Sequence, residues 1–62
     1  MEAIRTLIVD DEPLARRRIV QLLAKAPGFA LHGECRNGAE AVAALSAPGP
    51  GPDVVFLDVQ MP

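Results

Sequence analysis

Three aspartates follow two apolar runs of this sequence. Asp10 and Asp11 come directly after residues 6–9, and Asp58 comes directly after residues 54–57. Carboxylates that are brought close together repel one another and disfavour joint ionisation, and a bound divalent cation removes that conflict. Mg²⁺ is the natural candidate, because it takes one or two carboxylates and leaves room for waters and phosphate oxygens. If the two runs are neighbouring strands, the spacing predicts a magnesium site.

A carboxylate can also act as a nucleophile. Aspartate can attack phosphorus and form an acyl phosphate, and phosphoryl transfer requires mainly correct positions and neutralised charge. Asp58 stands alone after its apolar run, whereas Asp10 and Asp11 form an adjacent pair. We therefore assign Asp58 as the candidate nucleophile and the pair as the acids that hold the metal.

Simpler explanations exist for each of these acids. Asp10, Asp11 and Glu12 could form the acidic start of a helix, where negative charge suits the helix dipole. Asp58 alone could be an ordinary turn residue. The matching positions of the acids at two strand ends favour a shared site. The basic run at residues 16–18 is interpreted as the solvated side of a helix.

Segments with strand-like and helix-like patterns alternate along the chain. Two of them are continuously apolar, which is typical of parallel strands covered on both faces. Residues 29–35 alternate more, with Leu31, Gly33 and Cys35 expected on one side, which indicates a strand near the sheet edge. The predicted order is a strand at 6–9, a helix at 14–26, a strand at 29–35, a short helix after Asn37 and a strand at 54–57.

The helix ends have recognisable signals. Pro13 suits a first turn, and Asp11 or Glu12 can cap it. Pro27 and Gly28 are expected to end this helix, and Asn37 with Glu40 three residues later resembles a capping box. The series strand, helix, strand, helix, strand predicts an α/β fold with a parallel sheet and right-handed crossovers. A ligand site is then expected beyond the carboxyl ends of the strands.

Composition excludes several classes of protein. The 62 residues leave room for one small domain, and 50% hydrophobic residues argue against disorder. A net charge of −2 is not typical of a chain held to nucleic acid by charge. The single cysteine cannot form an internal disulfide. No apolar run reaches the length of a membrane span and no signal peptide is recognisable, so we expect a cytoplasmic location without membrane contact.

Two stretches carry a family resemblance. Residues 7–16, LIVDDEPLAR, and residues 53–62, DVVFLDVQMP, resemble the receiver domain of bacterial two-component response regulators. The resemblance implies a partial flavodoxin-like fold with parallel strands in the order 2-1-3, residues 1–62 being the N-terminal part of a receiver domain. Residues 12–16, EPLAR, are similar to regulators with a LytTR-type DNA-binding output.

The resemblance also implies roles for individual residues. Asp58 would accept phosphate from a histidine kinase. Asp11 would bind Mg²⁺ directly, Asp10 mainly through water, and the backbone carbonyl of Gln60 would complete the protein ligands. The family also uses a Ser or Thr after the fourth strand and a Lys after the fifth, which residues 1–62 do not include. We therefore expect this chain alone to be inactive, and to reach DNA only through an output domain outside it.

Other functions and a self-association are also compatible with this sequence. A phosphatase or phosphotransferase with an aspartate nucleophile often has a second acid two residues later, where this chain has Gln60. An interaction module, with carboxylates that bind metal or nothing, is a further alternative. A homodimer could form through the exposed edge of the strand at 54–57 or through uncovered sheet faces.

Overall fold

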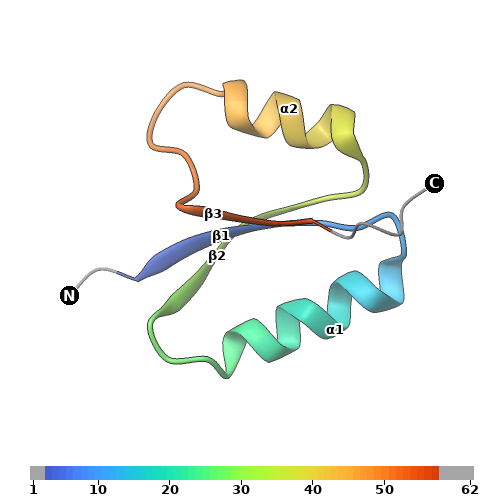
Figure 1. Cartoon of the computed structure of the whole chain (residues 1–62), viewed down its shortest axis with the longest axis vertical. Coiled ribbons are helices and arrows are strands. Elements are labelled where there is room, and N and C mark those ends of the chain that lie inside the picture. Colours follow the sequence, from blue (N-terminus) through green and yellow to red (C-terminus); the bar gives the residue numbers. More distant parts are fainter. Residues whose placement is uncertain (1–2, 58–62) are drawn as a thin grey trace.

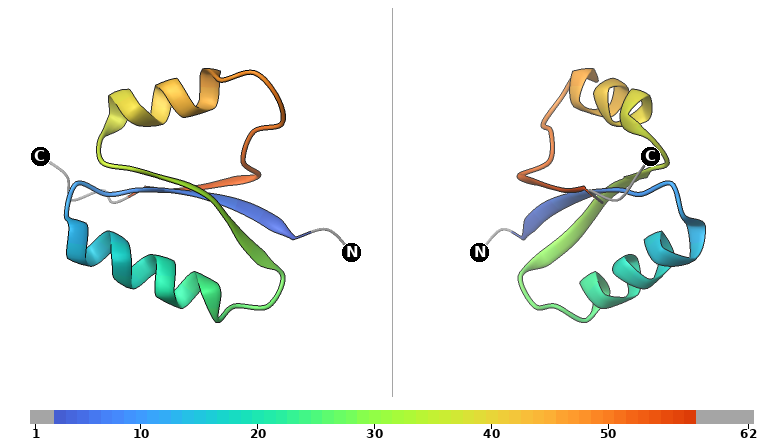
Figure 2. Two further views of the ribbon diagram at one scale, coloured as in Figure 1. Left: turned by 180° about the vertical axis from the view of Figure 1, so that it is seen from behind. Right: turned by 45° about the vertical axis from the view of Figure 1, so that its right-hand side comes forward.

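The computed structural model describes residues 3–57 and contains a three-layer α/β arrangement (Figure 1). Three parallel strands form one sheet in the order β2-β1-β3, which confirms the predicted fold class and strand order. One helix lies on each face of the sheet (Figure 2). Neither described helix is long and apolar enough to cross a membrane. The elements are β1 (Ile4–Val9), α1 (Pro13–Ala24), β2 (Phe29–Cys35), α2 (Gly38–Ser46) and β3 (Val54–Leu57).

β1 is the central strand and carries most of the buried residues. It pairs with β2 on one side and β3 on the other, so Val9 lies opposite both Cys35 and Leu57. Leu7, Val9 and Cys35 form the core on the α2 side of the sheet, where α2 contributes two small residues, Ala41 and Ala44. The continuous apolar run of β1 is therefore buried as predicted, because both of its edges and both of its faces are occupied.

α1 begins as predicted and ends earlier than expected. The Glu12 carboxylate caps it by accepting the N–H of Leu14 at 3.2 Å. The last helical residue is Ala24, two residues before the predicted end. The residue before a proline is disfavoured in helical conformation, so Ala26 does not continue the helix ahead of Pro27. Gly28 then takes a positive φ of 86°, which reverses the chain into β2.

β2 contains an irregularity that the alternating pattern did not predict. Thr6 lies opposite Leu31, but the next residue of β1, Leu7, lies opposite Gly33. The extra residue of β2 shifts the register, so side chains before and after it exchange faces. Leu31 accordingly lies beside α1 residues such as Val20, whereas a Cβ on Gly33 would lie 3.4 Å from Leu7 on the other face. The prediction that Leu31 shares a side with Gly33 and Cys35 is wrong.

The sheet is only partly covered at its β3 edge. All four residues of β3 are exposed, and Phe56 keeps 51% of its surface accessible. Thr6, on the same face as Phe56, has a buried hydroxyl with no hydrogen-bond partner among the described residues. An apolar groove between α1 and the sheet is lined by Thr6, Ile19, Leu22, Leu23, Ala26, Phe29, Val54 and Phe56.

The central position of β1 predicts a large difference between two identical substitutions. Val9 is fully buried, whereas Val42 on α2 is 64% exposed. We expect Val9→Ala to lower the free energy of unfolding by about 2 kcal/mol, because it removes buried methyl groups and leaves a cavity. Val42→Ala should be neutral or slightly stabilising, since alanine favours a helix. Urea denaturation of both variants measures the difference, and equal effects would contradict a core centred on β1.

Candidate functional site

The carboxyl ends of β1 and β3 lie side by side. Val9 and Leu57 are paired in the sheet. Asp10 and Asp11 follow β1 directly, so the structure places this predicted pair at the expected edge of the sheet. The other two predicted ligands, Asp58 and Gln60, lie outside the described residues.

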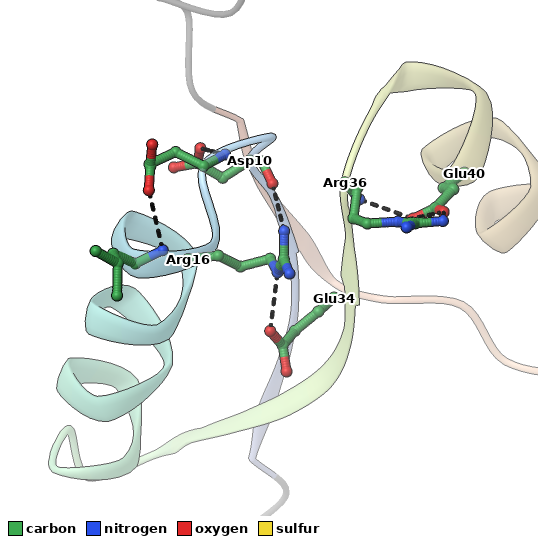
Figure 3. A network of polar contacts seen from close by, with 7 residues as sticks. Asp10, Arg16, Glu34, Arg36 and Glu40 are labelled. Carbon is green, nitrogen blue, oxygen red and sulfur yellow. Dashed lines mark hydrogen bonds and ion pairs between the residues drawn. The ribbon is translucent and has the colours of Figure 1, made fainter.

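Three hydrogen bonds fix Asp10, and Figure 3 shows the two that involve the start of α1. Its N–H donates to the carbonyl of Cys35 at 3.0 Å, which extends the pairing of β1 with β2. Its carbonyl accepts Nη1 of Arg16 at 2.8 Å. Its carboxylate Oδ1 accepts the N–H of Glu12 at 2.9 Å, in the turn that leads into α1. The backbone and the side chain of Asp10 are therefore both held.

The Asp10 carboxylate is buried without a cationic partner. Only 2% of this residue is exposed, and the ion pairs among residues 3–57 are Arg5–Asp53, Arg16–Glu34 and Arg36–Glu40. A buried charge is costly unless it is paired or coordinates a metal. Carboxylate oxygens are the donors that a hard divalent cation prefers. Asp10 and the exposed Asp11 therefore fit part of a magnesium site.

The described residues do not form a complete metal site by themselves. No group of three or more His, Cys, Asp or Glu side chains within residues 3–57 is arranged to hold an ion. The acid pair supplies two carboxylates, and no third such side chain within residues 3–57 is placed to join them. The predicted third carboxylate, that of Asp58, follows Leu57 in the sequence.

Sequence reasoning missed two residues of this edge, Arg16 and Glu34. Arg16 donates from Nε to Glu34 Oε1 at 3.2 Å, and its side chain is only 17% exposed. The interpretation of residues 16–18 as solvated holds for Arg17 and Arg18, which are exposed, and is wrong for Arg16. The helical period could have indicated that Arg16 lies on a different face of the helix from Arg17 and Arg18. Its partner Glu34 could not be predicted, because it lies 18 residues away in the sequence.

The start of α2 lies beyond the carboxyl end of β2 and has its own ion pair. Asn37 caps the helix by accepting the N–H of Glu40 at 2.9 Å. Glu40 in turn accepts the N–H of Arg36 at 2.8 Å and pairs with its guanidinium at 2.8 Å. In the predicted capping box, Glu40 would reach the N–H of the cap residue; here it reaches one residue further back. The hydrogen bonds from the Arg36 side chain and backbone lower the pKa of the Glu40 carboxyl.

Cys35 is the one thiol of the chain and lies in the core. Burial, with a smaller contribution from the negative charge of Glu40, raises its pKa. The thiolate form that binds metals and attacks electrophiles is therefore disfavoured. Cys35 acts here as a small apolar residue beside Leu7 and Val9.

A β2-β1-β3 sheet with an acid pair after its central strand is the arrangement expected of a receiver domain. The model of the response regulator receiver domain family matches residues 6–62. The chain belongs to this family, and the predicted resemblance to a receiver domain is confirmed.

Several curated proteins are similar to this chain over nearly its whole length. The transcriptional regulatory protein BtsR of Salmonella typhi is 49% identical over 59 residues, covering 95% of this chain and 24% of that protein. BtsR of Escherichia coli K12 is 46% identical over the same length. A protein-glutamate methylesterase/protein-glutamine glutaminase of Pseudoalteromonas atlantica is 42% identical over 60 residues, which cover 97% of this chain and 15% of that protein. This chain thus spans about a quarter or less of these relatives. No solved structure gives a significant match.

The lowered pKa of Glu40 predicts a pH dependence of stability. A carboxyl whose pKa is lower in the folded state stabilises that state above its ordinary pKa, and this contribution is lost as the pH falls through the lowered folded value. Stability should therefore decrease with acidification below about pH 4.5, the ordinary value for this glutamate. Glu40→Gln should reduce that decrease while keeping an oxygen for the N–H of Arg36. Urea midpoints at pH 3 to 7 measure it, and identical pH profiles for both proteins would contradict the assignment.

Proposed function

We propose that this chain is the N-terminal part of the receiver domain of a cytoplasmic two-component response regulator, with Asp58 as its phosphoacceptor. The observation that carries the proposal is the buried carboxylate of Asp10, which has no cationic partner among the described residues and lies at the end of β1 beside β3. Asp58 follows the β3 residue that pairs with Val9. Receiver domains interact with histidine kinases, and membership of the family supports a kinase as the phosphate donor.

The proposed reaction is a stoichiometric transfer of a phosphoryl group. A carboxylate oxygen of Asp58 attacks the phosphorus, the bond from phosphorus to the kinase histidine breaks, and an acyl phosphate forms. Asp10, Asp11, Asp58 and the backbone carbonyl of Gln60 would hold Mg²⁺. Bound Mg²⁺ would neutralise charge on the phosphoryl oxygens. The chain's own contribution is to hold the carboxylates in place at the strand ends.

The output of the intact regulator is proposed from residues 12–16 and from the relatives. The EPLAR stretch is similar to regulators with a LytTR-type DNA-binding output, and two of the relatives are named as transcriptional regulatory proteins. We propose that residues 1–62 precede the remainder of the receiver domain and a DNA-binding domain in a longer protein. Residues 1–62 by themselves would then be inactive, because they lack the family's Ser or Thr and its Lys.

Asp58→Ala should abolish phosphorylation of the full-length protein. Treatment with acetyl phosphate and Mg²⁺, followed by intact-mass measurement and peptide mapping, should locate one hydroxylamine-sensitive phosphoryl group on Asp58. Asp53→Asn is the matched control, because Asp53 precedes the same strand at its opposite end and pairs with Arg5. An adduct that persists in Asp58→Ala would disprove the assignment, and turnover of a phosphate ester would indicate the phosphatase alternative.

Asp11→Asn should weaken Mg²⁺ binding by about tenfold or more, because it removes one negative ligand from the site. Glu12→Gln is the matched control, because it removes the same charge one residue along and keeps an oxygen for capping the N–H of Leu14. We expect the control to bind Mg²⁺ within about twofold of the wild type. Calorimetric titration of the full-length proteins measures both, and equal affinity of wild type and Asp11→Asn would remove Asp11 as a ligand.

We also propose that residues 1–62, prepared alone, self-associate through β3. This strand pairs only with β1 within the described residues and has four exposed apolar side chains. An open apolar strand edge is a template for pairing with another chain, and a two-fold dimer would close the assembly. Light scattering at micromolar concentration should show association, which Val55→Lys should reduce. A cooperatively folded monomer would contradict this expectation.

A further inference from the structure

We infer that Arg16 is a positioning residue for the acid pair, holding the end of β1 in the geometry that binds the cation. The inference rests on the proposed function, since it concerns the same magnesium site. It assigns Arg16 and its partner Glu34 a role in metal affinity, although neither contacts the metal.

The Arg16 guanidinium connects three elements (Figure 3). Nη1 donates to the carbonyl of Asp10, the residue after β1, at 2.8 Å. Nε donates to Glu34 Oε1 on β2 at 3.2 Å. The base of the side chain is fixed in the first turn of α1, where the N–H of Arg16 donates to the carbonyl of Glu12 at 2.9 Å. One side chain thus ties the turn that carries Asp10 and Asp11 to both a strand and a helix.

The hydrogen bond from Arg16 to the Asp10 carbonyl lies directly after Val9, the last residue of β1 that pairs with β2 and β3. Asp10 is 2% exposed, so a buried carbonyl without a donor would carry a desolvation cost. Arg16 supplies that donor, and Glu34 fixes the plane of the guanidinium, whose nitrogens are arranged in a rigid fork. Asp11 is exposed and follows Asp10 directly, so its position depends on the backbone that Arg16 holds. Groups that do not touch a metal but orient its ligands commonly change the metal affinity by about 10- to 100-fold when they are removed.

Positioning and simple electrostatics predict opposite results for removal of Arg16. The guanidinium is positive and binds the carbonyl of a residue in the acid pair, so it repels a cation at that site. If charge alone mattered, Arg16→Ala would tighten Mg²⁺ binding. If Arg16 positions the acids, the same substitution weakens Mg²⁺ binding. Removal of the repulsive positive charge then does not compensate for the loss of the fixed position of the acid pair.

The first measurement is calorimetric titration of the full-length protein with Mg²⁺ alone. We expect Arg16→Ala to bind Mg²⁺ about tenfold more weakly than the wild type. Arg17→Ala is the matched control: it removes the same charge from the next residue, which is exposed. Its affinity should be unchanged or slightly higher. Equal or tighter binding by Arg16→Ala, or the same loss in Arg17→Ala, would overturn the inference.

Arg16→Lys covers the case in which the alanine variant does not fold. Lysine keeps the charge but offers a single ammonium group instead of the fork that reaches both acceptors. We expect a smaller loss of Mg²⁺ affinity than for Arg16→Ala, with native circular dichroism. A folded Arg16→Lys protein with wild-type or tighter Mg²⁺ affinity would also overturn the inference.

A second readout needs no metal. The N–H of Glu12 donates to Asp10 Oδ1, so its hydrogen exchange reports whether the turn is held. In the metal-free full-length protein, Arg16→Ala and Arg16→Lys should accelerate exchange at Glu12 more than Arg17→Ala does. Unchanged protection at Glu12 in both Arg16 variants would show that the turn is held without Arg16, and would count against the inference.

A double-mutant cycle tests whether Glu34 acts through Arg16. Glu34→Ala should weaken Mg²⁺ binding, and the double variant Arg16→Ala/Glu34→Ala should lose no more affinity than Arg16→Ala alone. Additive losses would show that Glu34 acts independently. The result also distinguishes failure of the proposed function from failure of this inference. If the proposed function is wrong, the wild type itself binds no Mg²⁺. If Mg²⁺ binding depends on Asp11 but not on Arg16, only the positioning role of Arg16 is refuted.

Discussion

β1 is paired on both edges and covered by a helix on each face, so Thr6 to Asp10 are all buried. This burial depends on the run of apolar residues that ends at Val9 and on the two crossovers that return β2 and β3 to its sides. The crossovers also bring the carboxyl ends of the three strands to one edge. Because Asp10 is buried like the strand residues before it, its carboxylate lies at that edge with little access to water.

That position determines the chemistry of the edge. A carboxylate exposed to water would need no cation, whereas one with 2% exposure and no ion pair among the described residues favours one strongly. The backbone around it is held by Cys35, Glu12 and Arg16. The hydrogen bonds that hold the buried end of β1 therefore also fix the backbone and the carboxylate of Asp10.

Local signals predicted most of the elements. Glu12, Pro13, Asn37 and Glu40 mark the starts of both helices, because capping is a contact between near neighbours in sequence. Continuous apolar runs identified β1 and β3, and the acid pair was recognised from its position after a buried strand. α1 ends two residues before the predicted position: Pro27 disfavours a helical conformation at Ala26, and Lys25 is the C-cap residue of the helix.

By itself, the sequence determined the order of elements, the helix starts, the candidate acids and, through its resemblance to receiver domains, the family and strand order. Only the tertiary structure decided the extra residue in β2, which depends on the register against β1. It also decided that Arg16, and not Arg17 or Arg18, turns toward the sheet, because the partners of Arg16 are the Asp10 carbonyl and Glu34, 18 residues away. Such choices depend on contacts between segments distant in sequence, which no local pattern of residues encodes.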